Sequence, residues 1–285
     1  MADIGYTMYD VRAKRRALSI GKRTLIMGVL NVTPDSFSDG GRYPDAASAA
    51  ESAKEMISQG ADIIDIGGES SRPGSERISA AEEIRRVMPV IEALKGASVP
   101  VSIDTWKGEV ARRALRAGAD MVNDITALKG DPDMAGVIAE FDAAVVLMHM
   151  KGDPGDMQDA PYYDDVMSEI CSYLSEASVR AEDAGIDPEK IIVDPGIGFG
   201  KTLEHNLMIL KELGRLKEEL KRPVLAGASR KSFIGEVTGK DVTKRVFGTA
   251  ASVSAAVLAG ADIVRVHDVG EMADVVRVAD AIRRV

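Results

Sequence analysis

The stretch Gly60-Ala61-Asp62-Ile63-Ile64-Asp65-Ile66 decides the fold class of this 285-residue chain. It joins the end of a helix-patterned segment to a short apolar run of strand length, and the same junction recurs at 118–124 (GADMVND) and 260–266 (GADIVRV). Glycine closes the carboxyl end of many helices, and the apolar residues that follow suit a buried strand. A junction that is used three times indicates a chain built from repeated helix–strand units.

Eight strand-and-helix units can be counted after Thr24. Short apolar runs alternate with longer segments of helical period, which is typical of an α/β protein with a parallel sheet. The predicted strands are Leu25–Leu30, Ile63–Ile66, Val101–Asp104, Met121–Asn123, Ala144–Met148, Ile191–Asp194, Val224–Ala226 and Ile263–Val266. The predicted helices are Ala46–Gln59, Ala80–Leu94, Lys107–Ala117, Met134–Glu140, Val166–Ala184, Leu203–Leu213, Arg245–Leu258 and Glu271–Val285.

Eight regular units predict a single (β/α)₈ barrel over residues 24–285, preceded by an arm or hairpin at 1–23 that covers the bottom of the barrel. An open, doubly wound sheet of eight strands is the alternative. Barrels of about 250 residues are ordinary single domains, so the length of the chain does not require a second domain.

The composition argues against several classes of partner. A net charge of −9 and a pI near 5.0 disfavour nucleic acid and anionic membranes, because both need a basic surface. The small-residue run Ala250–Ala261 is too short to cross a bilayer and is interpreted as a buried helix. With one cysteine, Cys171, and no secretory signal, we expect a soluble cytoplasmic protein.

Polar side chains follow all eight predicted strands. In barrels the carboxyl ends of the strands form the active site, so these side chains should meet at one mouth. Any one of these polar sets could simply cap the end of its strand. Capping is a poor explanation for polar sets after all eight strands. The polar set comprises Asn31, Glu69–Arg72, Asp104, Asn123–Asp124, His149, Asp194, Ser229–Lys231, Arg265 and His267.

Two kinds of recognition are predicted at this mouth. Arg265 and His267 lie two residues apart on one strand and therefore share a face, which together with Lys231 suits a phosphate group. Carboxylates and an amide complement the adjacent N–H donors of a 2-amino-4-oxopyrimidine edge. The acceptors expected for that edge are Asp104, Asn123 and Asp194.

Two loops rich in turn-forming residues follow the first two strands. Asn31 precedes the first, 32–41, and its amide oxygen beside a diphosphate would suit Mg²⁺, which takes few protein ligands and keeps waters. A turn or cap residue is the alternative for Asn31. The second loop, Ser70–Gly74, carries Arg72, for which a solvated surface arginine is the alternative.

The run Gly196–Thr202 is similar to a nucleotide-binding loop but does not fit either known pattern. The phosphate-loop pattern needs glycine at Pro195, and the dinucleotide pattern needs glycine at Lys201. We therefore interpret the glycines as a sharp turn that presents Phe199 at the mouth of the site. His205, near the start of the next helix, is interpreted as a surface or capping residue.

Taken in order, these blocks resemble the dihydropteroate synthase family over nearly the whole chain after Thr24. Residues 27–41 (MGVLNVTPDSFSDGG) are similar to the opening signature of the family. The further blocks are 65–74 (DIGGESSRPG), 102–105 (SIDT), 122–125 (VNDI), 148–150 (MHM), 194–201 (DPGIGFGK), 229–232 (SRKS) and 263–268 (IVRVHD).

The resemblance implies that 4-aminobenzoate displaces diphosphate from 6-hydroxymethyl-7,8-dihydropterin diphosphate, which gives 7,8-dihydropteroate for folate biosynthesis. It implies a pterin site made of Asp104, Asn123, Met148, Asp194 and Lys231. The diphosphate would be served by Asn31 through Mg²⁺, by Arg265 and by His267. The aminobenzoate pocket would comprise Ser71, Arg72, Pro73, Phe199 and Ser229, with Asp39 closing it. The catalytic set would be Asp39, Arg72, Lys231, Arg265 and His267.

Small departures and several alternatives accompany the resemblance. Ser71 stands where many relatives carry threonine, and Ile197 where some carry phenylalanine. The alternatives are a pterin-dependent methyltransferase barrel, a non-catalytic pterin-binding or scaffold subunit, and an archaeal-type relative that uses a modified aminobenzoate. The resemblance also implies a homodimer through late barrel helices, for which Ala250–Ala261 offers a face of small residues.

Overall fold

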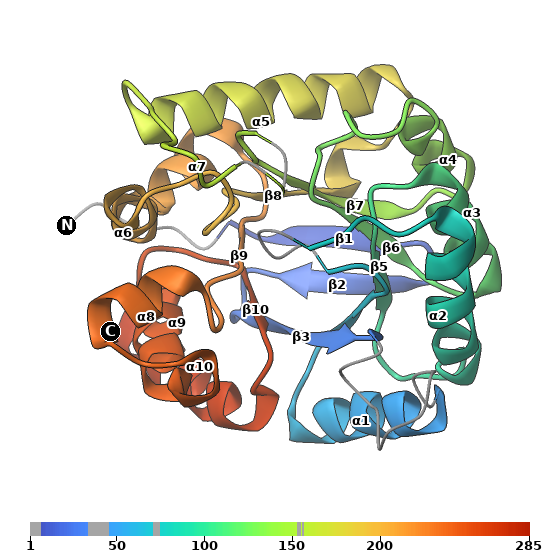
Figure 1. Cartoon of the computed structure of the whole chain (residues 1–285), viewed down its shortest axis with the longest axis horizontal. Coiled ribbons are helices and arrows are strands. Elements are labelled where there is room, and N and C mark those ends of the chain that lie inside the picture. Colours follow the sequence, from blue (N-terminus) through green and yellow to red (C-terminus); the bar gives the residue numbers. More distant parts are fainter. Residues whose placement is uncertain (1–6, 34–45, 71–74, 153–154, 156) are drawn as a thin grey trace.

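Eight parallel strands form a nearly closed barrel (Figure 1). The computed structural model describes residues 7–33, 46–70, 75–152, 155 and 157–285. The strands are β3 (Leu25–Asn31), β4 (Ile63–Gly67), β5 (Val101–Asp104), β6 (Met121–Asp124), β7 (Ala144–Met148), β8 (Ile191–Asp194), β9 (Leu225–Ala226) and β10 (Ile263–Val266). Their order is β8-β7-β6-β5-β4-β3-β10-β9, and a parallel bridge between Val193 and Val224 joins the two ends. The barrel is confirmed, and the open sheet is excluded.

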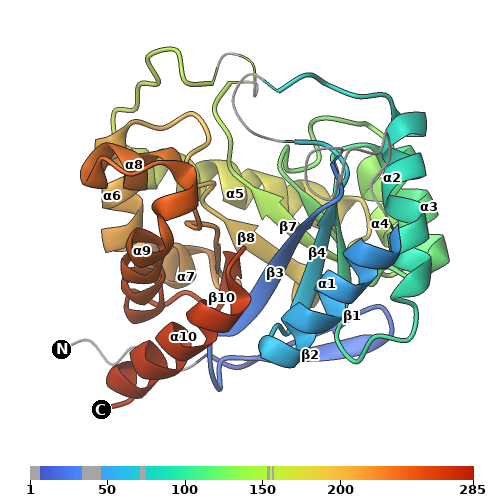
Figure 2. The same cartoon turned by 60° about the horizontal axis from the view of Figure 1, so that its bottom comes forward.

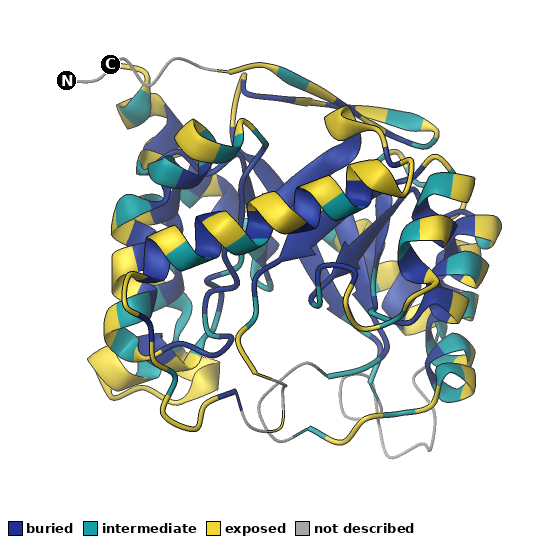
Figure 3. Ribbon diagram, turned by 90° about the horizontal axis from the view of Figure 1, so that it is seen from above, coloured by how far each residue is buried: buried dark blue, intermediate teal, exposed yellow. Residues whose placement is uncertain are grey.

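The helices surround the strands (Figure 2) and turn their buried faces toward them (Figure 3). They are α1 (Ala46–Gln59), α2 (Ala80–Ala93), α3 (Gly108–Ala117), α4 (Met134–Glu140), α5 (Val166–Asp183), α6 (Leu203–Glu212), α7 (Gly214–Leu220), α8 (Ser232–Thr238), α9 (Val246–Leu258) and α10 (Val269–Arg283), with short 3₁₀ turns η1 (Pro188–Lys190) and η2 (Val242–Lys244). The helices α7 and α8 were not predicted. No helix in the described ranges is both long and apolar enough to cross a membrane.

The buried apolar residues form two large cores and one small cluster at the mouth, which includes Met148 and Phe199. Outward-facing residues such as Ile64 and Val264 pack under the helices in one large core. Inward-facing residues such as Met27, Ile63 and Met121 fill the lower half of the barrel. Because side chains alternate along a strand, the next inward positions up each strand lie above this apolar floor. Those positions carry most of the polar residues of the mouth.

A hairpin closes the bottom of the barrel (Figure 2). Strands β1 (Tyr9–Ala13) and β2 (Arg16–Ile20) pair antiparallel, and their buried side chains, Val11 and Ile20 among them, join the core of the lower barrel. Arg16 Nη1 bonds Asp120 Oδ2 at 2.8 Å. The division of the chain at residue 23 stays a prediction.

The three Gly-Ala-Asp junctions share one structure. Their glycines adopt positive φ angles of 111°, 138° and 103°, which residues with a Cβ rarely adopt. Each aspartate carboxylate accepts a hydrogen bond from a backbone N–H near the start of the neighbouring strand. The pairs are Asp62 with Ile26 (2.9 Å), Asp120 with Val101 (3.1 Å) and Asp262 with Val224 (3.0 Å). The repeat therefore fixes the register of adjacent strands at the bottom of the barrel.

Candidate functional site

Two adjoining hollows lie at the carboxyl ends of the strands. The inner one measures about 20 Å³ and the outer one about 640 Å³. Both are lined by Asp104, Phe199, Gly227, Lys231 and Arg265, so these residues form a shared wall. Polar residues from seven of the eight predicted strand ends meet here. His149, predicted from the fifth strand, and Asp124, predicted from the fourth, line neither hollow. His149 instead contacts Lys201, and Asp124 accepts hydrogen bonds from the turn that follows β6.

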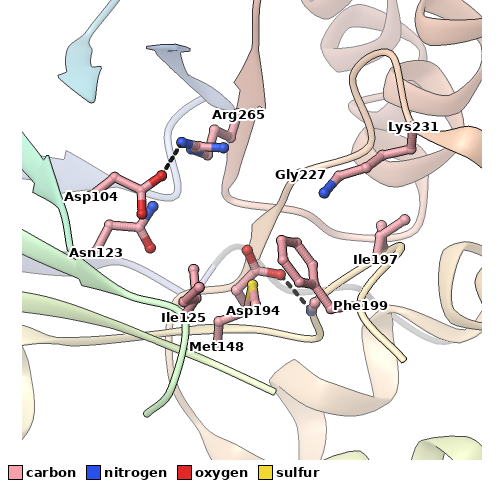
Figure 4. A pocket seen from close by; sticks show the side chains of 11 residues that line it. Asp104, Asn123, Ile125, Met148, Asp194, Ile197, Phe199, Gly227, Lys231 and Arg265 are labelled. Carbon is pink, nitrogen blue, oxygen red and sulfur yellow. Dashed lines mark hydrogen bonds and ion pairs between the residues drawn. The ribbon is translucent and has the colours of Figure 1, made fainter. Parts of the chain in front are cut away.

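The inner hollow contains every residue predicted for the pterin (Figure 4). Their side chains come from four strands and the start of α8 and converge on one small space. Met148 and Ile125 give this space an apolar side, whereas carboxylates, an amide and two cations give it a polar one. The residues brought together as predicted are Asp104, Asn123, Met148, Asp194 and Lys231.

Arg265 ties two carboxylates together at the wall between the hollows. Its Nε donates to Asp65 Oδ2 and its Nη2 to Asp104 Oδ2, both at 2.6 Å. Burial alone would lower the pKa of Arg265, but the Asp65 and Asp104 carboxylates outweigh it and raise that pKa. Burial raises the pKa of Asp104 to about 7, although Arg265 works against it. A guanidinium has five N–H groups, so Arg265 keeps further donors for an anion.

Asp65 also sets the orientation of Asn123. The Nδ2 of Asn123 donates to Asp65 Oδ2 at 3.0 Å, deep in the barrel. Its Oδ1 is therefore the amide atom left to accept hydrogen bonds from a ligand in the inner hollow. This geometry suits a ring edge that carries N–H donors.

Asp194 presents one carboxylate oxygen to the inner hollow, because the other is held by the loop that follows β8. Its Oδ1 accepts a hydrogen bond from the backbone N–H of Gly196 at 2.7 Å (Figure 4). Burial raises the pKa of Asp194, while Gly196, Lys231 and Arg265 oppose the shift. The Nζ of Lys231 lies 4.0 Å from the centre of the Phe199 ring, so cation and ring form one side of the site.

The outer hollow contains the residues predicted for the diphosphate, Asn31, Arg265 and His267, together with Ser229. His267 N donates to Ser229 Oγ at 3.2 Å, and this oxygen lies 3.0 Å from His267 Nδ1. In the tautomer in which the hydroxyl donates to Nδ1, the ring proton lies on Nε2 and faces a ligand as a donor. Burial, followed by Arg265 and Arg230, lowers the pKa of His267 to about 3, so the ring is a neutral donor at physiological pH.

The residues around Asn31 fit a Mg²⁺ ion that takes a single ligand from the protein. Asn31 ends β3 and lines the outer hollow, with Gly67 beside it on β4. Across the described ranges, no group of three or more His, Cys, Asp or Glu side chains could hold a metal. An ion that takes one amide oxygen and fills its other positions with diphosphate and water fits this donor set.

Four predicted residues lie outside the described ranges: Asp39, Ser71, Arg72 and Pro73. Of the predicted aminobenzoate set, the structure places Phe199 and Ser229 at the outer hollow. The turn at 196–200 presents Phe199 to the site as predicted, with positive φ angles at its three glycines. His205 is a helix cap as interpreted, since it forms a capping box with Thr202 at the start of α6.

The sequence analysis missed Asp65, Lys201 and Arg245. Arg245 lines the outer hollow beside Arg230, a member of the predicted polar set that forms a bidentate ion pair with Asp268. Asp65 could have been found, because it is a carboxylate at an inward position of an otherwise apolar strand. Lys201 gave no such signal, because its contacts depend on the curl of the loop before it and on His149, which follows another strand.

The comparisons with known proteins agree with this geometry. The family described as pterin binding enzyme matches residues 27–267. A dihydropteroate synthase of Synechocystis sp. is 48% identical over 283 residues, covering 99% of this chain and 94% of that protein. The Bacillus subtilis dihydropteroate synthase is 47% identical over 272 residues, covering 95% of this chain and 93% of that protein.

Solved structures agree as well. The dihydropteroate synthase of Xanthomonas albilineans with 4-aminobenzoic acid superposes with a TM-score of 0.91 at 44% identity, covering 98% of this chain and 100% of that one. The same protein in complex with 7,8-dihydropteroate gives a TM-score of 0.87 at 42% identity, with the same coverage. The chain described here therefore belongs to the dihydropteroate synthase family of pterin binding enzymes.

Proposed function

We propose that this enzyme condenses 4-aminobenzoate with 6-hydroxymethyl-7,8-dihydropterin diphosphate and releases 7,8-dihydropteroate and diphosphate. The observation that carries the proposal is the pair of hollows with a shared wall. The inner one offers acceptors for a pterin edge, and the outer one offers cations and donors for a diphosphate. Arg265 lines both and so faces the bond between the two parts of the substrate. We further propose that the enzyme works in the cytoplasm, in keeping with its one cysteine, which is buried.

The described residues contain what an SN1-like path would need. An electron-rich pterin can carry positive charge on its exocyclic methylene once diphosphate leaves, so a protein nucleophile is not needed. Arg265 and the Nε2–H of His267 would stabilise the charge that develops on the leaving group. Asp104, Asn123 and Asp194 would hold the ring so that the methylene faces the incoming amine, and Phe199 would pack against the benzoate ring.

We propose that Asn31 holds Mg²⁺ at the outer hollow. When bound, this ion would add charge to neutralise the diphosphate. Asn31 would supply one neutral oxygen to the ion. Arg265 and His267 line the same hollow as Asn31.

His267→Leu should lower kcat/KM for the pterin diphosphate without changing the pH dependence. The loss of one donor to the leaving group predicts a decrease of about tenfold or more. Because the pKa of His267 is lowered to about 3, the ring stays neutral from pH 5 to pH 8 in the folded enzyme. Rate profiles over that range should therefore have the same shape in both proteins. A limb near pH 6.5 that is present in the wild type and absent in the variant would contradict a neutral donor.

The reaction itself is tested by diphosphate release from the dihydropterin diphosphate with Mg²⁺, with and without 4-aminobenzoate, and by the mass of the pterin product. We expect dihydropteroate to form only when aminobenzoate is present. Pterin binding without condensation would instead favour a methyltransferase barrel or a non-catalytic pterin-binding subunit.

We also propose that two copies of the chain associate through α9 and α10. Large apolar side chains are exposed on these neighbouring helices, with Phe247 87%, Val278 61% and Ile282 60% exposed. Phe247→Glu should convert a dimer into a monomer in light-scattering measurements, because burying a charge at such a contact is costly. Val179→Glu on α5 is the matched control and should leave the mass unchanged. An unchanged mass for Phe247→Glu would place the contact elsewhere.

A further inference from the structure

Lys201 is a buried lysine that lines neither hollow. It lies between the loop 195–200 and α6, and only 3% of its surface is exposed. Its Nζ bonds Gly196 O and Phe199 O, both at 2.9 Å, and His149 Nδ1 at 3.0 Å. An ammonium group has three N–H donors and no acceptor, so these three partners satisfy it completely.

The third partner of Lys201 is a neutral imidazole. Burial, followed by the charge of Lys201, lowers the pKa of His149 to about 2. The Nδ1 of a neutral ring can accept the hydrogen bond from Lys201, which places the ring proton on Nε2. The ring itself is held by an edge contact with Tyr173, at 4.8 Å between centroids. Lys201 therefore joins the loop after β8 to the end of β7.

The loop that Lys201 holds presses closely on the segment after β7. A Cβ on Gly196 would lie 1.9 Å from His149 O, and one on Gly200 would lie 2.1 Å from Lys151 O. With positive φ angles at these glycines, the loop curls so that two of its carbonyls face the ammonium. The same loop carries Phe199 to the shared wall and uses the N–H of Gly196 to hold Asp194.

We propose that Lys201 is a positioning residue for pterin recognition, a role that rests on the proposed function. By bonding the carbonyls of Gly196 and Phe199, it holds in place two residues of the loop: Gly196, whose N–H orients Asp194, and Phe199, whose side chain closes the inner hollow. Burial lowers the pKa of Lys201 to about 7, with Asp194 favouring the charged form. Keeping a charge in such a place is costly, and an apolar side chain would leave two carbonyls and a ring nitrogen without their donor.

The test compares Lys201→Met with Lys190→Met. Lys190 is also buried and also bonds a backbone carbonyl, that of Asp142 at 3.0 Å, but it precedes β8 at the opposite end of the strand from Asp194. The dissociation constant for 6-hydroxymethylpterin would be measured by calorimetry, beside the melting temperature of each protein. Loss of the donor for two buried carbonyls predicts that Lys201→Met raises the dissociation constant about tenfold or more.

The control should separate positioning from stability. Lys190→Met should lower the melting temperature while the dissociation constant stays within about twofold of the wild type. Equal weakening in both variants, or a wild-type dissociation constant in a folded Lys201→Met, would overturn the proposal. If Lys201→Met does not fold, His149→Leu decides, since it removes one acceptor and should raise the dissociation constant about threefold. A wild-type protein that binds no pterin would instead contradict the proposed function.

Discussion

Replacing Arg265 with methionine should abolish most of the turnover and destabilise the fold at the same time. The guanidinium bonds both Asp65 and Asp104, and both carboxylates lie in the upper barrel. Without it, two buried carboxyl groups lose the cation that bonds them, which costs about 3–5 kcal/mol of unfolding free energy. The loss of a cation at the leaving group should lower kcat by about a hundredfold or more.

Urea denaturation and steady-state kinetics measure the two effects of Arg265→Met separately. Arg277→Met is the matched control, because Arg277 forms an ion pair with Asp274 on the exposed side of α10 at 3.0 Å. An exposed pair contributes about 0–1 kcal/mol, so the control should behave like the wild type. A stable and fully active Arg265→Met would refute both roles of the arginine.

Asp194→Asn should lose pterin affinity without losing stability. The asparagine oxygen can still accept the hydrogen bond from Gly196, which turns its amide nitrogen toward the hollow. A donor then faces the N–H groups of the pterin edge, and the dissociation constant should rise by about a hundredfold. Calorimetry with 6-hydroxymethylpterin measures this change.

The stability of Asp194→Asn has a predictable pH dependence. Burial raises the pKa of Asp194 in the folded state, so the folded wild type binds more protons than the unfolded chain above the unfolded pKa. Wild-type stability therefore falls with rising pH in that window, and the variant should become relatively more stable. Asp124→Asn is the control, because Asp124 is a buried carboxylate with a raised pKa that lines neither hollow. It should leave pterin affinity unchanged, and equal losses in both variants would contradict the assignment.

The strands could be predicted closely because each is a short apolar run between clear turn signals. Val101–Asp104, Ala144–Met148, Ile191–Asp194 and Ile263–Val266 have the predicted bounds. The helices α7 and α8 have seven residues each, as does α4, which was predicted. They were missed because each shares a connection between strands with a longer helix, α6 or α9, whereas α4 stands alone between β6 and β7. Tertiary contacts decide such short helices more than local pattern does.

The polar residues of the site could be predicted for a similar reason. Alternation along a strand and the rule that strands end at the active site place Asp104, Asn123 and Asp194 together. The ion pairs of Arg265 could not be predicted, because pairing depends on which inward residues share a level in the barrel. The contacts of Lys201 with His149 likewise depend on how two loops pack.

Closure of the barrel has a consequence for how the protein is made. Strand β3 pairs with β10, so Leu25 lies opposite Ile263, and the bond from Arg265 to Asp65 spans 200 positions. During synthesis β3 cannot pair with β10 until nearly the whole chain has been made. Contacts of such long range also form slowly. The wall between the two hollows is therefore among the last parts to assemble. An unfinished chain has no place for the pterin, and ligand binding should favour only the chains that have completed their barrel.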